Sequence, residues 1–402
     1  MMEARQVAYL MPTFKPYLPY FRFNNAGAII FGPGVAKDIG KNIKEIFGVN
    51  KVLVITDKNL IKIGILKRVE ESLRTAGVDM GVFSDVKENP TVEICDAAGE
   101  LLKKDNYKLV IGIGGGSCID GAKGASIVAS NGGSIRDYEG MDKVKKPIIP
   151  LIAVPTTAGS GSEVTSAAVI TDKKRNWKMG LRSLYIIPSL AVCDPELTLT
   201  LPPRLTASTG MDALTHAIES YTSTIKQPIS EVFALEAIRL IGISLRKSVM
   251  SGDQDIEARS NMLLGSILAG MAFPHTYLGI GHAMARALGG IFNIAHGLAN
   301  ATVLSHIMEF NAVACPEKYR KIAQVMGENE VKDLTILESA YKAVEVVHKL
   351  TKDIGIPTLS QLGIKEEDID LLADEAMKSG DRNFNPRITK KEDFIKLFYK
   401  AL

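Results

Sequence analysis

The pattern of apolar and polar positions changes its period near residue 200. Before that point, short β-branched runs bounded by turn residues alternate with amphipathic stretches, which predicts strands and helices in turn. Strand–helix alternation is typical of a parallel sheet with helices on both faces, so we expect an α/β domain over residues 1–201. The expected strands are 52–56, 109–113, 148–154 and 190–193, with helices such as 60–76 and 92–104 between them.

From about residue 202 the apolar positions follow the 3.6-residue period of helices, and strand candidates are scarce. This pattern predicts an all-helical domain over residues 202–402, with Pro202-Pro203 as the hinge. A chain of 402 residues also exceeds what one hydrophobic core usually supports. The clearest expected helices are 230–250, 256–272, 336–354 and 366–378.

Composition mainly excludes classes of partner. The net charge is +3 and the Lys and Arg residues are scattered, so we expect neither nucleic acid nor an anionic membrane surface. No apolar run reaches the roughly 18 residues of a transmembrane helix, and the proline-containing N-terminus lacks the apolar core of a secretory signal. Four widely spaced cysteines without a CxxC pair favour a reduced, cytoplasmic setting.

The N-terminal segment carries many large apolar side chains and has few of its own on which to pack them. Such a surface usually finds a partner, which predicts a homodimer or a higher homo-oligomer. The residues concerned are Tyr9, Leu10, Met11, Phe14, Tyr17, Tyr20 and Phe21.

A glycine-rich turn follows the expected strand 109–113 and leads into a helical stretch. Glycine lets the backbone approach a phosphate closely, and the helix N-terminus supplies amide donors and a positive dipole end. The turn is therefore a candidate pyrophosphate cradle, although similar tight turns also occur without a ligand. Its residues are Gly114, Gly115, Gly116 and Ser117.

Two further features are candidates for the same cofactor. Asp57 closes the strand 52–56, where a carboxylate can accept from a ribose hydroxyl and repel a 2′-phosphate. The general spacing rule points instead to Asp137 or Glu139, and the residues alone leave this choice open. The loop 155–165, in which seven of eleven residues are Gly, Ser or Thr, is either a second cradle or a plain surface loop.

Four of the six histidines fall between residues 216 and 296, and their spacing suggests a metal site. Asp212 and His216 share one face of a helix because they are four residues apart. His282 and His296 would lie about 21 Å apart on one straight helix. A helix break at Gly289-Gly290 would let the chain fold back, and one carboxylate with three imidazoles would then form a ligand set for a divalent transition metal.

These motifs, in this order, resemble the iron-containing (group III) alcohol dehydrogenases along nearly the whole chain. The resemblance implies a Rossmann-like dinucleotide-binding domain followed by an all-α domain, an architecture similar to that of dehydroquinate synthase. It rests on Gly114–Ser117 with Asp120 and Lys123, the loop 155–163, Asp194-Pro195, Pro202, Gly210, Asp212, His216, Glu219, His282, Gly289-Gly290 and His296-Gly297.

The resemblance also implies the ligands. Fe²⁺, or alternatively Zn²⁺, would bind Asp212, His216, His282 and His296. NAD rather than NADP would be the cofactor, with Asp57 reading the ribose in preference to Asp137. Asn89 would contact the adenosine side, and Gly115, Gly116 and Ser117 would hold the pyrophosphate. The residues that would line the path to the nicotinamide are Thr156, Thr157, Thr165 and Lys178. The remaining candidates for cofactor binding are Gly114, Asp120 and Ser160.

One position departs from the family pattern. Four residues after His282, where the family often has a histidine that assists proton transfer, this chain has Arg286. A guanidinium stays protonated and cannot shuttle protons, but it can hold an anionic or carbonyl oxygen. The alternatives are a salt bridge or a solvated helix face. If Arg286 does line the substrate site, proton release would run through water, ribose hydroxyls or His275.

The activity that the resemblance implies is the interconversion of a small primary alcohol or diol and its aldehyde by hydride transfer to and from NAD. A hydroxyacid-oxoacid transhydrogenase that retains its nicotinamide is one alternative. A dehydroquinate synthase-like lyase is another, but its polyanionic substrate would require several cations near the metal. Arg286 is the only Lys or Arg between His275 and His296.

Overall fold

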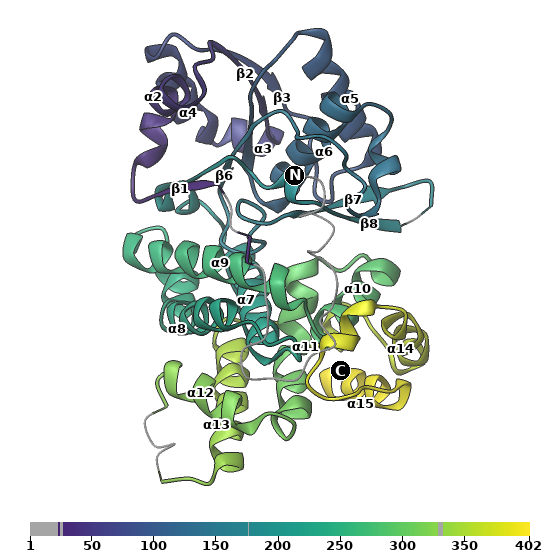
Figure 1. Ribbon diagram of the computed structural model, residues 1–402. Coiled ribbons are helices and arrows are strands. Elements are labelled where there is room, and N and C mark those ends of the chain that lie inside the picture. Colours follow the sequence, from purple (N-terminus) through teal and green to yellow (C-terminus); the bar gives the residue numbers. More distant parts are fainter. Residues whose placement is uncertain (1–22, 25–26, 176, 329–332) are drawn as a thin grey trace.

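The computed structural model describes residues 23–24, 27–175, 177–328 and 333–402, so the aromatic N-terminal segment lies outside the described residues. An α/β domain and a helical domain are stacked on each other (Figure 1). The predicted fold class is confirmed, while the boundary at residues 201 and 202 stays a prediction. No single described helix is long and apolar enough to cross a membrane; α9 (Ile256–Thr276) and α10 (Ile280–Phe292) pass that test only as a pair bent by 101°.

The α/β domain is built on six parallel strands in the order β1-β9-β6-β4-β2-β3. Strands β4, β6 and β9 are buried along their whole length, because helices cover both faces of the sheet. The strand bounds are β1 Ala28–Phe31, β2 Lys51–Ile55, β3 Asp79–Phe83, β4 Val110–Gly114, β6 Leu151–Pro155 and β9 Leu190–Cys193.

Alternating side chains of the strands enter two separate cores. Val52 and Val54 pack with α4 on one face, whereas Leu53 and Ile55 pack with α5 and α6 on the other. This is the period-2 alternation of an extended chain. The helices of this domain are α2 Ile39–Asn42, α3 Lys58–Lys62, α4 Ile65–Thr75, α5 Val92–Lys104 and α6 Gly116–Asn131.

A second, three-stranded sheet was not expected. It has the order β5-β8-β7 and is formed by β5 Gly140–Met141, β7 Ala167–Asp172 and β8 Trp177–Arg182. Asp172 is fully buried at the end of β7, where Arg136 and Arg175 each pair with it at 2.6 Å. These two guanidiniums hold the pKa of Asp172 well below its usual range.

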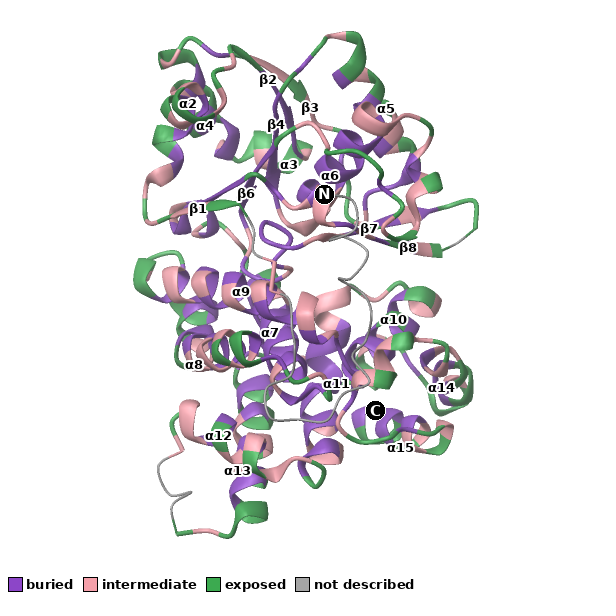
Figure 2. Ribbon diagram, in the orientation of Figure 1, coloured by how far each residue is buried: buried purple, intermediate pink, exposed green. Residues whose placement is uncertain are grey.

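The helical domain begins with α7, whose first residue is Pro203 of the expected hinge. Figure 2 shows α7 as mostly buried, in agreement with its central place in the largest core. The helix bounds are α7 Pro203–Thr222, α8 Pro228–Ser251, α9 Ile256–Thr276, α10 Ile280–Phe292, α11 His296–Ala312, α12 Pro316–Val325, α13 Ile336–Asp353, α14 Ile369–Met377 and α15 Lys391–Ala401.

Two helix predictions were wrong in their details. The expected helix 60–76 is divided into α3 and α4, because Gly64 between them has a φ of 82°. The expected break at Gly289-Gly290 does not occur, and α10 runs through both glycines to Phe292. The chain reverses instead at Asn293, which caps α10 in the left-handed conformation with a φ of 54°. His296 then begins α11, so the predicted fold-back is present although its position differs.

The two domains meet where the loop after β6 touches α9. A Cβ atom at Gly270 would lie 2.8 Å from the Cα atom of Gly161, which is closer than real Cβ atoms approach backbone. Gly159, in the same loop, lies equally close to Thr209 of α7. Glycine at these positions therefore sets how closely the loop approaches the helical domain.

We expect Gly270→Ala to lower the free energy of unfolding by about 1–3 kcal/mol, because the added methyl group must push the loop away. Helix propensity alone would favour alanine by about 1 kcal/mol, so a loss would report the contact with Gly161. The control is Gly242→Ala in α8, where the added atom meets only the flexible side chain of Met326 at 3.3 Å. Equal unfolding midpoints for both variants in thermal denaturation would contradict the prediction.

Candidate metal centre and cofactor loops

Three helices bring the metal-ligand candidates together. Asp212 comes from α7, His282 from α10 and His296 from the first turn of α11. One ligand atom from each of these residues lies within 4.8 Å of the other two. Asp212 and His282 are buried, whereas the side chain of His296 is 40% exposed. We call these three residues the ligand group.

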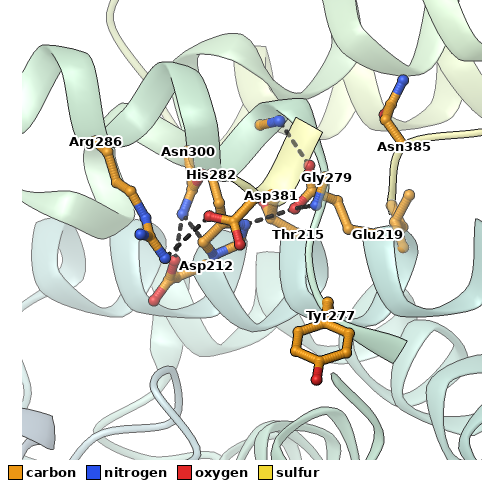
Figure 3. Close-up of polar contacts among 12 residues, drawn as sticks. Asp212, Thr215, Glu219, Tyr277, Gly279, His282, Arg286, Asn300, Asp381 and Asn385 are labelled. Carbon is orange, nitrogen blue, oxygen red and sulfur yellow. Dashed lines mark hydrogen bonds and ion pairs between the residues drawn. The ribbon is translucent and has the colours of Figure 1, made fainter. Parts of the chain in front are cut away.

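Asn300, one turn after His296 on α11, lies at the centre of this group. Its amide nitrogen is 2.7 Å from Asp212 Oδ1, 3.2 Å from His282 Nε2 and 3.3 Å from His296 Nε2 (Figure 3). An amide group has two hydrogens and cannot donate to three acceptors at once. Convergence of a carboxylate oxygen and two imidazole nitrogens on one point is the arrangement that a divalent cation satisfies, so the residues fit a metal.

His216 lies beside the ligand group rather than within it. Its ring is stacked between Phe273, at a centroid distance of 4.5 Å, and His282, at 4.7 Å. Its Nδ1 atom is buried and has no hydrogen-bond partner among the described residues. Burial lowers the pKa of His216 to about 4, so the ring is neutral and keeps a lone pair for a ligand.

Glu219 fixes the orientation of His282. Its carboxylate, buried on α7, accepts hydrogen bonds from His282 Nδ1 at 2.6 Å and from the backbone N–H groups of Gly279 and Gly281 at 2.8 and 2.6 Å (Figure 3). With Nδ1 occupied as a donor, His282 presents the lone pair of Nε2 to the ligand group. Burial opposes the charge on Glu219, but His282 and the two amides outweigh it and hold the pKa of Glu219 below its usual value.

The two other catalytic candidates do not join the ligand group. Arg286 is 60% exposed and forms an ion pair with Asp381 at 2.9 Å, which is the salt bridge considered as an alternative from the sequence. His275 lies against residues 23–24: its Nε2 atom is 3.0 Å from the carbonyl oxygen of Asn24, and its ring packs on Phe23.

The glycine turn and the second polar loop lie side by side. Gly114 ends β4 with a φ of 146°, and Gly115 caps the N-terminus of α6. Thr156 donates its N–H to the carbonyl oxygen of Gly114 at 3.0 Å. A Cβ atom at Gly115 would lie 3.3 Å from Thr157, and one at Gly116 would lie 2.6 Å from Ser160 Oγ. The two candidate cradles are thus one continuous surface at the carboxyl ends of β4 and β6.

Buried polar groups hold the second loop in place from behind. Lys123 is fully buried and donates to the carbonyl oxygens of Thr165 at 2.9 Å and Ala167 at 2.7 Å. Asp120 accepts from Ser162 Oγ at the loop and from the N–H of Val169 at 2.8 Å. Asp120 and Thr165 are thus bound to the protein, which suits a supporting role better than direct contact with a cofactor.

The adenosine-side candidates surround the start of α6. Asp57 lies directly after β2 and caps α3 by accepting from the N–H groups of Asn59 at 2.8 Å and Leu60 at 3.0 Å. Asn89 donates its N–H to Ser117 Oγ at 3.2 Å, so these two candidates are in contact.

The rival acidic candidates are occupied elsewhere. Asp137 forms a capping box with Ser134, and Glu139 pairs with Arg175 and Trp177 near the second sheet. Lys178, on β8, approaches α10 at Gly289 and is therefore on the side of the α/β domain that meets the helical domain.

Several residues of the site were not predicted. Asn300 has the i+4 spacing from His296 that would place it on the same helix face, but the start of that helix was unknown. Glu219 was part of the motif, yet no role could be assigned to it. Phe273 and Asp381 are brought to the site only by tertiary contacts.

Comparison with known proteins agrees with this geometry. Residues 26–195 match the model of the iron-containing alcohol dehydrogenases, and residues 206–402 match that of the C-terminal part of the Fe-containing alcohol dehydrogenase family. The chain belongs to the iron-containing alcohol dehydrogenase family. It is therefore an oxidoreductase of the iron-containing alcohol dehydrogenase type. Among its relatives, one is named an NAD-dependent methanol dehydrogenase, and a sulfoacetaldehyde reductase from Bifidobacterium kashiwanohense, 31% identical, has been solved in complex with NAD+.

The similarity to individual members extends over nearly the whole chain. The NAD-dependent methanol dehydrogenase of Bacillus methanolicus is 39% identical, with 93% of this chain and 98% of the relative covered. The 1,3-propanediol dehydrogenase of Citrobacter freundii is 40% identical, with 92% and 96% covered. A crystal structure of a 1,3-propanediol oxidoreductase superposes with a TM-score of 0.92 at 38% identity, covering 96% of this chain and 100% of that one.

We expect His282→Ala to abolish stoichiometric metal binding, because it removes one ligand and leaves the Glu219 carboxylate without its partner. The control is His306→Ala, which removes a histidine from the same bundle, on α11, without touching the ligand group. Elemental analysis of freshly purified protein and nucleotide binding by the same samples would check this. A His282→Ala protein with full metal content would refute the assignment.

Proposed function

We propose that this enzyme interconverts a small primary alcohol or diol and its aldehyde by hydride transfer with NAD. The observation that carries the proposal is the contact between the two halves of the site. Gly159, in the loop beside the glycine turn, packs directly against Thr209 on α7, one helical turn before Asp212 of the ligand group. A nicotinamide that follows this loop would therefore arrive next to the ligand group.

The ligand group and the loop after β6 would have separate tasks in this reaction. A bound divalent metal would supply Lewis acidity that lowers the pKa of a coordinated hydroxyl, and NAD would accept the hydride. Asp212, His216, His282 and His296 would hold the metal, with Glu219 keeping the imidazole of His282 in the required tautomer. The loop residues Thr156, Thr157 and Ser160 would orient the nicotinamide, and Lys123 and Asp120 keep that loop rigid.

The cofactor contacts follow the same logic. Gly114, Gly115, Gly116 and Ser117 would bind the pyrophosphate, since they lie at the N-terminus of a 16-residue helix. Asp57 would accept from the adenosine ribose with its second carboxylate oxygen, and Asn89 would lie beside it. Lys178 would line the nicotinamide side, and Thr165 would support the loop from behind through its contacts with Lys123.

An assay for reduced nicotinamide tests the proposal directly. Iron-loaded protein with added NAD should reduce it in the presence of ethanol, propan-1-ol or propane-1,3-diol, and should oxidise NADH with the matching aldehydes. A retained-cofactor transhydrogenase would instead need a second oxo substrate and no added NAD. Metal-loaded protein that binds NAD but oxidises none of these alcohols and reduces none of the aldehydes would refute the proposal.

Removing the charge at Asp57 should relax cofactor choice. Asp57→Asn keeps a side chain that can cap α3 but removes the repulsion of a 2′-phosphate, so the ratio of kcat/KM for NADP to that for NAD should rise by at least tenfold. Asp57→Gly should act in the same direction at little cost in stability, because glycine is a tolerated cap. A wild-type enzyme that already favours NADP would contradict the assignment.

We also propose that the enzyme is a homodimer or a higher homo-oligomer, because the apolar residues before Asn24 need a partner surface. Light scattering should then give a mass above the 43.5 kDa of one chain at all working concentrations. We further propose a division into domains 1–201 and 202–402, since α7 starts at Pro203 and every strand among the described residues precedes it.

A further inference from the structure

Tyr277 has a backbone conformation that its residue type rarely adopts. It lies between α9 and α10 with φ 59° and ψ −177°, in a region where glycine is the usual residue. The other described non-glycine residues with positive φ are all Asn or Asp, which tolerate such values. Glycine would remove the strain at Tyr277, so the side chain must contribute something that glycine cannot.

The ring of Tyr277 is held by a stack that joins both domains. Phe384, from the 3₁₀ turn Gly380–Phe384, stacks on it at a centroid distance of 4.4 Å and an angle of 13°. The guanidinium of Arg182, at the end of β8 in the α/β domain, lies 4.7 Å from the ring centroid. Neither Tyr277 nor Phe384 belongs to the hydrophobic cores found among the described residues, so core packing does not account for the ring.

The position of this stack connects it with the ligand group. Two residues after Tyr277, the N–H of Gly279 donates to Glu219, which in turn orients His282. The 3₁₀ turn that supplies Phe384 also supplies Asp381, the partner of Arg286. Figure 3 shows the ring of Tyr277 to one side of the ligand group, with its hydroxyl pointing away from Glu219. The stack therefore lies at a contact between the two domains, beside the residues that hold His282 and Arg286 in place.

We propose that Tyr277 is a specificity-determining residue, whose stacked ring closes one end of the substrate site and restricts the enzyme to short, unbranched primary alcohols. This inference rests on the proposed function and adds a limit on substrate length. The strain at residue 277 is maintained because the ring is needed as a wall between Arg182 and Phe384.

The test compares Tyr277→Gly with the wild-type enzyme over straight-chain alcohols from ethanol to hexan-1-ol. Tyr277→Gly relieves the backbone strain and removes the wall. The ratio of kcat/KM for hexan-1-ol to that for ethanol should rise at least tenfold, mainly through a lower KM for hexan-1-ol. Metal content should be unchanged. Tyr277→Phe should keep the wild-type ratio, because it keeps the ring.

The control is Asn106→Gly, which also places glycine at a positive φ, 56° just after α5, but lies outside the stack and the ligand group. In this variant, the ratio of kcat/KM for hexan-1-ol to that for ethanol should equal the wild-type ratio. A Tyr277→Gly enzyme that loses activity equally for all alcohols, or keeps the wild-type ratio, would overturn the proposal and leave the ring with a structural role only.

A second readout separates this inference from the proposed function. In the presence of NAD and metal, hexan-1-ol should raise the thermal unfolding midpoint of Tyr277→Gly more than that of the wild type, whether or not turnover occurs. An enzyme that oxidises no alcohol but shows this difference would refute the proposed reaction and support the wall. If both proteins oxidise ethanol, but Tyr277→Gly and the wild type have the same kcat/KM ratio and the same shift of the unfolding midpoint, only the proposed role of Tyr277 would be refuted.

Discussion

The buried carboxylate of Glu219 is the interaction on which the arrangement of the site depends. It joins α7 to the N-terminal end of α10 through three hydrogen bonds, two from the backbone amides of Gly279 and Gly281 and one from His282. A buried charge of this kind is tolerated because every partner donates to it, and removal of one partner would leave the carboxylate itself less well compensated. The same contact sets the relative position of Asp212 on α7 and His282 on α10, so packing of the helices and geometry of the ligand group are fixed together.

The sequence predicted the elements whose signal is local and strong. Strands β2, β4, β6 and β9 are short apolar runs, and α5, α8, α9 and α13 are long and periodic, so their periods alone identify them. Strands β1 and β3 were not predicted because they lie at the two edges of the sheet and are only partly buried. The hairpin of β7 and β8 carries Lys178 and Arg182 among its apolar residues, and these charges obscure its pattern.

The residues of the site also fall into those that the sequence could predict and those that it could not. The glycine turn could be named from a local pattern. The four ligand candidates come from three helices, and they could be grouped through the spacing of Asp212 and His216 together with the family resemblance. The reversal between His282 and His296 was assigned to the wrong residues, because helices tolerate glycine and the left-handed cap at Asn293 was not recognised. Asn300, Asp381 and the stack around Tyr277 depend on contacts between distant segments, and no local pattern reveals them.

The glycine contact between the loop after β6 and α9 limits the routes by which a substrate can reach the ligand group. Gly161 touches Gly270 and Gly159 touches Thr209, so backbone meets the helical domain there with no room for a passing molecule. The stack of Arg182, Tyr277 and Phe384 bridges the domains at a second place. In and beside the ligand group, the side chains of His296 and Arg286 reach the surface, with 40% and 60% exposed. An alcohol entering and an aldehyde leaving would therefore pass along α10, by way of these two side chains.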